Sequence, residues 1–461
     1  MKHLHHIVRT ETRELVLLAG PIALMQVGQI SNGFVDVLMV GQLGPASLAG
    51  VALGNATYFL FVLVCIGTLM AVGPMVSQAF GADDHDLIGR SVRQGIWLGL
   101  ALAVPVVFVL WNTAHLWQHM RQDAATIIMA QAYLRAAVWG LLPFLWFIAL
   151  RSFIEAVSRP WPVTFIILTG VGLNALANYA LMFGRFGLPA LGLVGTGWAT
   201  AIVNWFMFLA VLVLVQARPK FCTLAALKHL RRPDLPVIRE LLHIGLPIGA
   251  SYGLEVTMFS AAAFFVGTLG PAPLAAHQIA IQCAAFTFMV PLGIGIATTV
   301  RVGQAIGRKE PIHAVWAGYL GMGLAGLFML CTSILFWVFP RSIVGLFLDL
   351  GDPANAITVT IGVSLLGLAA FFQIFDGLQV SAAGALRGFK DTRTPMVICF
   401  ISYWLLGIPL AATLGFMAGL GAQGFWWGLV AGLFAAACML GLRFWWRSRR
   451  LRGRKQHRNP P

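Results

Sequence analysis

The amino-acid sequence predicts an all-α polytopic membrane protein, with twelve transmembrane helices in two six-helix bundles related by a parallel pseudo-two-fold repeat. The first observation is composition. The chain of 461 residues is 59% hydrophobic and only 10% charged, whereas a soluble protein of this size needs roughly 25% charged residues. The second is a series of long apolar runs, and the third is a set of short motifs shared by the two halves.

Each apolar run exceeds the roughly 20 residues that a helix needs to cross the hydrocarbon core of a bilayer. Backbone polar groups in lipid need partners within their own segment, which favours helices. The runs are also too long and continuous for the strands of a membrane barrel. We predict spans at residues 15–40, 47–78, 92–113, 126–150, 161–184, 191–215, 241–267, 274–300, 314–339, 355–385, 395–417 and 421–446.

Lys and Arg residues lie mostly on one side of this arrangement. With a cytoplasmic N-terminus, the opposite loops hold only Arg121, Arg185 and Arg341, while Arg135 lies inside the fourth span. The positive-inside rule therefore predicts a multi-pass protein of the cytoplasmic (inner) membrane with both termini in the cytoplasm. This bias accounts for the net charge of +15, so we expect no nucleic-acid partner. No cleavable signal peptide is expected, because no short apolar region ends in a small-residue cleavage site.

The longest charged connection lies at residues 216–240, midway along the chain, and carries six basic residues. It predicts an N-lobe at 1–215, a cytoplasmic basic linker at 216–240, and a C-lobe at 241–461 that ends in a basic tail. The beginnings of the two lobes are similar in sequence. Leu43-Gly44-Pro45 recurs as Leu269-Gly270-Pro271 at an offset of 226 residues.

The same offset relates Gln78-Ala79-Phe80-Gly81 to Gln304-Ala305-Ile306-Gly307, and an offset of 229 relates Leu191-Gly192 to Leu420-Gly421. Six helices in each half mean that both halves enter the membrane from the same side. The repeats are therefore parallel, with a pseudo-two-fold axis along the membrane normal. This architecture predicts a cavity between the lobes near the middle of the membrane.

Three acidic residues lie inside predicted spans, namely Asp36, Glu255 and Asp376. A charged group at the bilayer centre costs at least about 2.5–3.5 kcal/mol on insertion scales, so each is a candidate functional residue. The alternative is a protonated or paired acid that only holds helices together. The predicted spans contain no basic residue placed to neutralise three acids, because Arg135 is near the outer surface.

Polar and aromatic side chains at helical spacing accompany these acids. Such spacing places them on one side of a helix, where they face a cavity rather than lipid. Interhelical hydrogen bonding is an equal alternative for the neutral groups. The candidate cavity residues are Gln29, Asn32, Asn174, Asn178, Thr200, Tyr252, Gln278, Gln282, Phe286, Phe372 and Gln379.

An acidic cavity with aromatic neighbours attracts cations and accommodates flat apolar groups. Carboxylates without permanent partners can carry H⁺ or coordinate Na⁺ through oxygen. One site that accepts either an ion or a cationic solute is the elementary requirement for antiport. The residues alone therefore lead to the hypothesis of antiport, in which protonation and cation binding compete for one site.

The sequence resembles the multidrug and toxic compound extrusion (MATE) family, in its bacterial NorM-like branch. The resemblance covers all twelve spans and is carried by Pro21…Asp36…Gly41-x-Leu-Gly-Pro, Gln78-Ala79-Phe80-Gly81, Pro247…Glu255, and Ala385-Leu386-Arg387-Gly388-Phe389-Lys390-Asp391-Thr392 with Pro395. It implies a V-shaped, two-lobed exporter that works by alternating access. Inflow of H⁺ or Na⁺ would drive efflux of cationic amphipathic drugs across the cytoplasmic membrane.

The resemblance also implies roles for the acids. Asp36 matches the acid of an N-lobe site, and Asn174, Asn178 and Thr200 match its polar surroundings. Glu255 and Asp376 match the C-lobe acids that bind the coupling cation, which makes them a possible Na⁺ site. Members with a Na⁺ site often have Tyr one turn before the last acid, where this chain has Phe372.

Other classes of protein fit the sequence less well. A lipid-linked oligosaccharide flippase of the same superfamily would need buried Arg or Lys for its diphosphate, where these spans offer acids. A channel would not need a two-lobed repeat with titratable acids. No nucleophile–base set or phosphate-binding loop indicates an enzyme, and we expect no cofactor. We expect a monomer whose partners are small cationic organic substrates and the lipid bilayer.

Overall fold

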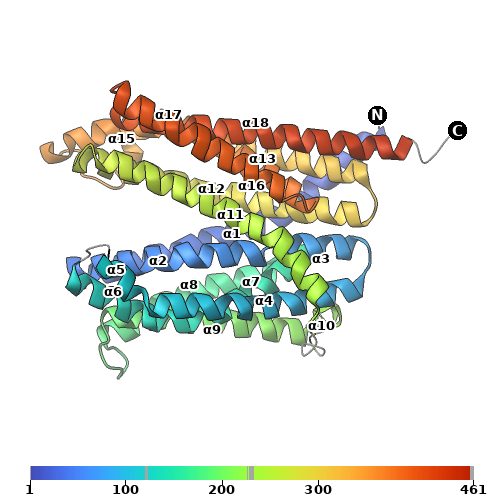
Figure 1. Cartoon of the computed structure of the whole chain (residues 1–461), viewed down its shortest axis with the longest axis horizontal. Coiled ribbons are helices and arrows are strands. Elements are labelled where there is room, and N and C mark those ends of the chain that lie inside the picture. Colours follow the sequence, from blue (N-terminus) through green and yellow to red (C-terminus); the bar gives the residue numbers. More distant parts are fainter. Residues whose placement is uncertain (1, 120–122, 226, 228–232, 457–461) are drawn as a thin grey trace. The chain divides into compact units, whose positions relative to one another are not determined.

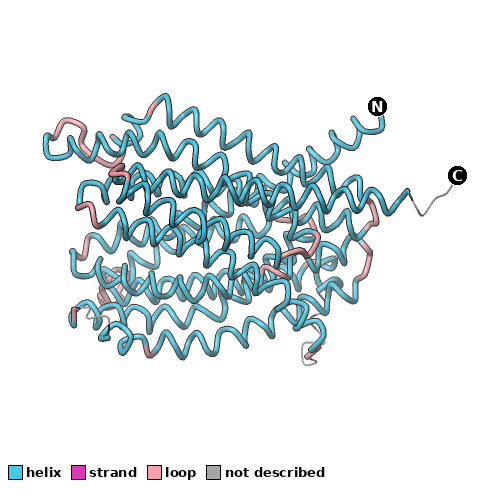
Figure 2. Tube along the Cα trace, turned by 45° about the horizontal axis from the view of Figure 1, so that its top comes forward, coloured by secondary structure: helices cyan, strands magenta, loops and turns pink. Residues whose placement is uncertain are grey.

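Figure 1 shows the chain as a computed structural model that describes residues 2–119, 123–225, 227 and 233–456. These residues form helices joined by short connections, and no strand occurs among them (Figure 2). Twelve helical segments in the described part of the chain are long and apolar enough to cross a membrane. The predicted fold class is therefore confirmed.

The helices group into two compact units. The N-terminal unit is Leu24–Gly249, and the C-terminal unit is Met1–Ala23 together with Ala250–Pro461. These units differ from the predicted lobes at two helices. Helix α1 (Lys2–Gly41) and helix α11 (Leu235–Gly267) each contribute residues to both units.

The N-terminal unit contains the later part of α1 and the early part of α11. Between them lie α2 (Pro45–Leu69), α3 (Val72–Gly81), α4 (His85–Trp111), α5 (Thr113–His119), α6 (Ala124–Ala137), the 3₁₀ turn η1 (Val138–Gly140), α7 (Leu141–Ala156), α8 (Trp161–Phe183), α9 (Leu193–Ala217) and α10 (Pro219–Ala225). The predicted run 47–78 is thus two consecutive helices. The fourth span extends through α7 to Ala156, six residues beyond its predicted end.

The C-terminal unit contains the remainder of α1 and α11. Its other elements are α12 (Pro271–Gly307), α13 (Pro311–Val338), α14 (Pro340–Val344), η3 (Pro353–Asn355), α15 (Ala356–Gly388), α16 (Arg393–Phe400), α17 (Ile408–Ala412) and α18 (Gly421–Gln456). Two π-helical segments, η4 (Ile401–Gly407) and η5 (Thr413–Met417), interrupt the eleventh span. Such segments often lie near functional sites.

The backbone explains why the motifs repeat. Gly44 and Gly270 have φ angles of 101° and 112°, and each is followed by a proline that begins a helix. Only glycine adopts such angles without strain, and proline suits the first position of a helix because its missing N–H would be unpaired there. Leu-Gly-Pro therefore encodes the same turn in both halves, as the parallel repeat predicts.

Both divided helices change unit shortly after a proline at equivalent positions. Pro21 lies two residues before the division of α1, and Pro247 lies two residues before that of α11. The two prolines are related by the repeat offset of 226 residues. Since proline removes one backbone hydrogen bond, a long helix bends most easily there.

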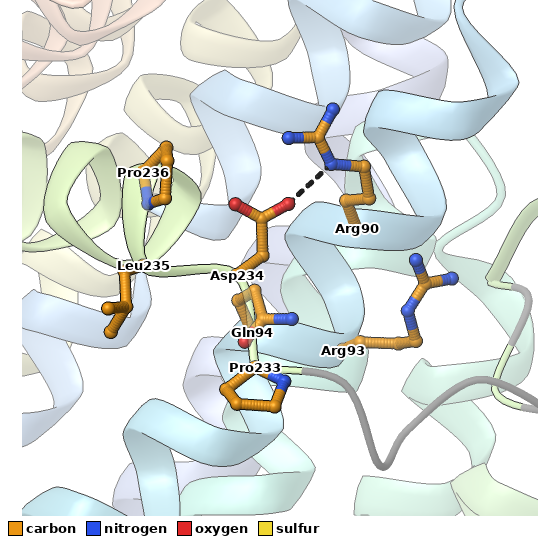
Figure 3. Close-up of a pocket in the computed structure, with 7 residues that line it drawn as sticks. All are labelled: Arg90, Arg93, Gln94, Pro233, Asp234, Leu235 and Pro236. Atoms are coloured by element: carbon orange, nitrogen blue, oxygen red, sulfur yellow. Dashed lines mark hydrogen bonds and ion pairs between the residues drawn. The ribbon is translucent and has the colours of Figure 1, made fainter.

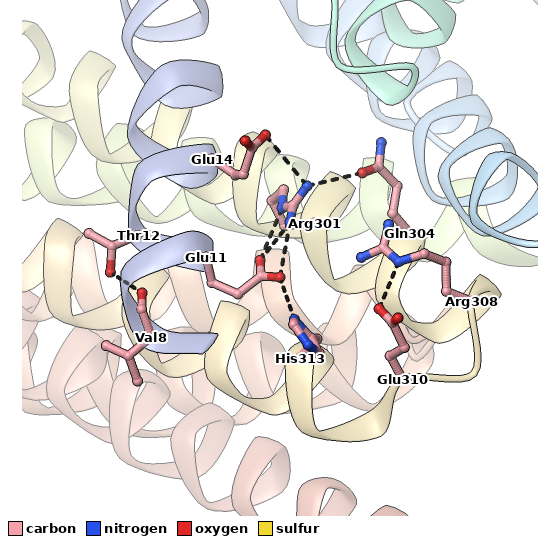
Figure 4. Close-up of polar contacts among 9 residues, drawn as sticks. All are labelled: Val8, Glu11, Thr12, Glu14, Arg301, Gln304, Arg308, Glu310 and His313. Carbon is pink, nitrogen blue, oxygen red and sulfur yellow. Dashed lines mark hydrogen bonds and ion pairs between the residues drawn. The ribbon is translucent and has the colours of Figure 1, made fainter. Parts of the chain in front are cut away.

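The first part of α1 is held in the C-terminal unit by a buried carboxylate (Figure 4). Glu11 is 1% exposed, and its Oε2 accepts hydrogen bonds from Nη2 and Nε of Arg301 on α12 at 2.8 and 3.1 Å. His313 Nδ1 on α13 lies 2.8 Å from its other oxygen. In the turn between α12 and α13, the Arg308 guanidinium holds the pKa of Glu310 below its usual range.

The beginning of α11 is held in the N-terminal unit by a more exposed pair (Figure 3). Asp234 precedes α11 and accepts a hydrogen bond of 2.6 Å from Arg90 Nε on α4. This bond holds the pKa of Asp234 below its usual range. The pair borders a surface pocket of about 450 Å³ that Arg93 and Gln94 also line.

Close packing in the C-terminal unit centres on α12 and α15. A Cβ atom on Gly384 would lie 2.3 Å from the carbonyl oxygen of Gly295, so glycine is required at this crossing. Thr299 on α12 donates a hydrogen bond of 2.8 Å to the Gly384 carbonyl. This contact fixes the part of α15 that follows Asp376.

Candidate functional site

Asp36 lies on α1 and is bound by two amides from α8. Its Oδ1 accepts hydrogen bonds from Nδ2 of Asn174 and Nδ2 of Asn178 at 2.8 and 2.6 Å. The four-residue spacing of the asparagines places both on one face of α8. Gly28 permits the close approach of these helices, since a Cβ there would lie 3.3 Å from Ile167. The structure thus brings together Asp36, Asn174 and Asn178 as predicted.

The partners of Asp36 are neutral. Among the described residues, its Oδ2 accepts no hydrogen bond, and no cation forms an ion pair with it. The carboxyl group therefore has no resident counter-charge and one oxygen that accepts no hydrogen bond. A proton or a small cation can bind there without displacing a resident cation.

Two other residues predicted around Asp36 have different surroundings. Thr200 donates a hydrogen bond of 3.0 Å to the Thr196 carbonyl within α9, and the hydrogen bonds of Asp36 in the described part of the chain come from Asn174 and Asn178. The Oδ1 atom of Asn32 is buried and has no hydrogen-bond partner in the described part of the chain. Asn32 lies one turn before Asp36 and leaves an unsatisfied acceptor beside the site.

Gln29 belongs to a polar network that the sequence does not reveal. Arg151 on α7 donates to Oε1 of Gln29 at 2.9 Å and also to Oε1 of Gln26. The same guanidinium binds Glu155 Oε1 at 2.6 Å, and both charged side chains are less than 8% exposed. Gln29 was expected to face the cavity, but its oxygen is instead bound to Arg151.

The basic residue of this network is paired with Glu155, so it does not neutralise Asp36, Glu255 or Asp376. Arg151 and Glu155 fall just beyond the predicted end of the fourth span, and the helix continues through them. Their four-residue spacing is a signal that could have been recognised, because it is typical of an ion pair on one helix face. The network fixes the part of α1 that precedes Asp36.

The second acidic site lies in the C-terminal unit. Gln379 Nε2 donates to Oε1 of Glu255 on α11 at 3.4 Å and to Oδ1 of Asp376 on α15 at 3.3 Å. Asp376 and Gln379 are 4% and 3% exposed, and Glu255 is partly buried. One amide therefore holds two carboxylates from different helices, as the predicted stripes of polar residues require.

Tyr252 precedes Glu255 by one turn of α11 and holds a cation. Its hydroxyl accepts a hydrogen bond of 2.9 Å from Arg387 Nη1, and the guanidinium carbon lies 4.9 Å from the centre of its ring. Arg387 lies in the last turn of α15. Tyr252 was expected to line the cavity, and its hydroxyl is instead bound by this arginine.

Phe372 does not line a cavity. It is 2% exposed and packs against Phe259 and Trp426, with ring centroids 5.8 and 5.6 Å away. Trp426 in turn donates to Nδ1 of the buried His277 at 3.1 Å. The expectation for Phe372 is corrected because its ring packs within the hydrophobic core, although Asp376 follows it by one turn.

The remaining predicted residues lie on α12 and point away from the core. Gln278 and Gln282 are exposed, and Phe286 is 56% exposed. An amide turned toward lipid would be costly, so these glutamines favour water-filled surroundings for this face of the helix. No group of three His, Cys, Asp or Glu residues that could hold a metal ion occurs in the part of the chain described.

Comparisons with known proteins agree on one family. A family model described as MatE matches residues 21–180 and 247–413, two segments that begin one repeat offset apart. A relative from Pseudomonas aeruginosa, described as a probable multidrug resistance protein NorM, is 41% identical over 96% of this chain and 90% of its own. Another with the same description, from Pseudomonas putida, is 40% identical over 98% of both chains.

Solved structures share the fold. The crystal structure of a MATE protein in the straight conformation has a TM-score of 0.87 and 19% identity, over 96% of this chain and 97% of its own. The eukaryotic MATE transporter AtDTX14 has a TM-score of 0.84 and 22% identity, over 97% and 99% of the two chains. With the matched family model and the two acidic sites, these likenesses lead to one conclusion: the chain belongs to the MATE family of transporters, in its bacterial NorM-like branch.

Proposed function

We propose that this protein is a cation-coupled antiporter that exports cationic amphipathic drugs and toxic compounds across the cytoplasmic membrane by alternating access. One observation carries the proposal. Asp36, Glu255 and Asp376 lie within membrane-spanning helices and accept hydrogen bonds from neutral amides rather than from basic side chains. The names of the relatives, probable multidrug resistance proteins, support the substrate class.

The coupling follows from exclusive occupancy of these carboxylates. A buried site that carries net negative charge is unfavourable, so a cation occupies it at nearly all times. A cationic drug and the coupling ion then compete for the same charge, and inflow of one drives release of the other. Asp36, Glu255 and Asp376 are the proposed coupling residues.

The coupling ion is H⁺ or Na⁺. Glu255 and Asp376 offer two carboxylates on one amide, and Na⁺ binds oxygen ligands of this type. The Gln379 side chain points its nitrogen toward both acids. A Na⁺ ion at this site would favour the flipped amide, in which the oxygen faces the ion. Phe372 brings no hydroxyl to such a site.

Substrates would contact polar and aromatic groups on exposed helix faces. Gln278, Gln282 and Phe286 on α12 supply hydrogen bonds and a flat apolar surface. Such surfaces suit planar organic cations, which combine charge with aromatic area. Asn32 and Thr200 are proposed to have the same role in the N-terminal lobe.

The bias of Lys and Arg toward one side supports cytoplasmic termini and insertion in the inner membrane. We propose lobes at 1–215 and 241–461, joined by the basic linker 216–240, as the parts that alternate. A monomer that binds no nucleic acid is sufficient for this function. A flippase is disfavoured because the buried Arg151 and Arg301 are bound to Glu155 and Glu11.

Ethidium efflux from everted membrane vesicles tests this function. A pH gradient and a Na⁺ gradient are imposed separately, on wild type and on the Asp36→Asn, Glu255→Gln and Asp376→Asn variants. We expect wild-type transport under at least one gradient and its loss in each variant. Transport that ignores both gradients, or that survives all three substitutions, would contradict the proposal.

A further inference from the structure

Arg387 lies in the motif Ala385-Leu386-Arg387-Gly388, to which the proposed function assigns no role. Its guanidinium is held at two points by one side chain, through the hydrogen bond to the Tyr252 hydroxyl and through the face of the ring. A charged donor that also stacks on an aromatic ring has little freedom to move. The positive charge therefore has a fixed place in the C-terminal unit.

That place is next to the acids. Tyr252 and Glu255 lie one turn apart on α11 and so share a helix face. Arg387 comes about three turns after Asp376 on α15, and helical side chains lean back toward the N-terminus of their helix. The hydrogen bond to Tyr252 therefore holds the guanidinium beside the face of α11 that also carries Glu255.

Other ionisable groups, namely Arg301, Cys399, Tyr403 and His277, do not supply a positive charge to the acids. Arg301 on α12 is bound to Glu11 through both oxygens. Cys399 and Tyr403, on the span that begins at Arg393, interact with the same acids but are ordinarily neutral at physiological pH. His277 accepts a hydrogen bond from Trp426 and so keeps its Nδ1 unprotonated.

We propose that Arg387 is a resident counter-charge that sets the net charge of the Glu255–Asp376 site to a single negative charge. Two carboxylates and one guanidinium leave one charge to be neutralised. One H⁺ or Na⁺ then suffices to fill the site, and one monovalent drug cation suffices to replace it. This rests on the proposed function and adds to it the number of coupling ions that the C-terminal site exchanges.

The charge predicts how many protons a drug displaces. Purified full-length protein in Na⁺-free buffer is titrated by calorimetry with the organic dication methyl viologen, in two buffers of different protonation enthalpy, at the pH where wild-type release is greatest. Wild type then holds one displaceable proton and Arg387→Gln holds two, because neutrality of the buried site is restored by protonation, so the variant should release about one proton more per bound dication. Arg387→Lys keeps the charge and should match wild type.

A double variant keeps the test valid if Arg387→Gln alone misfolds. Arg387→Gln leaves two buried acids without their counter-charge and can fail to fold, which size-exclusion chromatography detects. Glu255→Gln with Arg387→Gln removes one charge of each sign and should release as many protons as wild type. An unchanged number in the single variant, or one proton fewer in the double variant, would overturn the role of Arg387. A wild type that binds the probe without releasing any proton would instead contradict the proposed coupling.

Discussion

The two acidic sites are built on different chemistry. In the N-terminal unit, one carboxylate accepts two hydrogen bonds from neutral amides of one helix. In the C-terminal unit, two carboxylates from different helices share the two hydrogens of one amide, with a guanidinium nearby. The backbones of the halves repeat, yet the acids do not.

This difference shows that the same charge can be reached in two ways. Asp36 alone presents one negative charge, and Glu255 with Asp376 and Arg387 presents one as well. The first site needs only neutral donors to position its acid. The second joins α11 to α15 through the hydrogen bond from Gln379 to Glu255, so its occupancy bears directly on the contact between two helices of the same unit.

The largest expected effects concern the two buried charged networks that hold helix α1, one in each unit. Arg151→Gln in the N-terminal unit leaves the buried Glu155 without its partner, and Glu11→Gln in the C-terminal unit leaves the buried Arg301 with only the longer ion pair of 3.9 Å to Glu14. We expect each to lower the free energy of unfolding by about 3–5 kcal/mol. Thermal unfolding of the purified protein measures this, and the exposed Arg185→Gln serves as a matched control. Variants as stable as that control would show that buried charge does not hold α1.

An intermediate effect distinguishes one shared donor from two separate donors. Gln379→Leu removes the amide from both C-terminal acids, whereas Asn174→Leu or Asn178→Leu leaves Asp36 one hydrogen bond. Each bond to a charged group contributes about 1.5–3 kcal/mol, and about 1.4 kcal/mol corresponds to a factor of ten in rate, so loss of both bonds should slow ethidium efflux at least about a hundredfold in Gln379→Leu. The single asparagine variants should lose less, and their double variant should equal Gln379→Leu.

The opposite order of efflux rates would contradict this comparison of the two acidic sites. If either asparagine variant alone stopped efflux while Gln379→Leu retained it, the shared amide would have no role in coupling. Surface expression and retention of tetraphenylphosphonium binding are the controls, because they separate lost coupling from lost protein.

The smallest effect concerns the partly exposed ion pair between Asp234, just before α11, and Arg90. Asp234 has a pKa below its usual range in the folded protein, so its contribution is present above the unfolded pKa of about 3.9 and is lost as pH falls through the folded value. The pair with Arg90 is partly exposed, and Asp234→Asn should cost only about 0.2–1 kcal/mol. Melting temperatures at pH 5–8 should show a constant small deficit that shrinks at more acidic pH. A deficit that grew in acid would contradict this assignment.

The sequence predicts most of the fold because its signals are local. Apolar runs define the spans, and Gly44-Pro45 and Gly270-Pro271 encode a turn whose backbone angles leave little choice of residue. The division of α1 and α11 between units is different. It depends on contacts such as Glu11 with Arg301, far apart in sequence, which hydropathy does not encode.

The sequence predicts several of the residues that lie together in these sites, but it does not predict which partner each of them binds. Spacing on α8 correctly brings Asn174 and Asn178 to one face, and they do meet Asp36. Spacing could not show that Arg151 holds Gln29, because long side chains at helix ends reach groups on other helices. Phe372 illustrates the same limit, since a position one turn from an acid can face the core.

Transport by the purified protein in proteoliposomes tests the central claim most directly, because no other transporter is present. Tetraphenylphosphonium flux is measured under an imposed pH gradient, an imposed Na⁺ gradient, or neither, for wild type and for protein carrying Asp36→Asn, Glu255→Gln and Asp376→Asn together. The account predicts gradient-driven flux for wild type and none for the triple variant. Gradient-driven flux in the triple variant at the wild-type rate would contradict it.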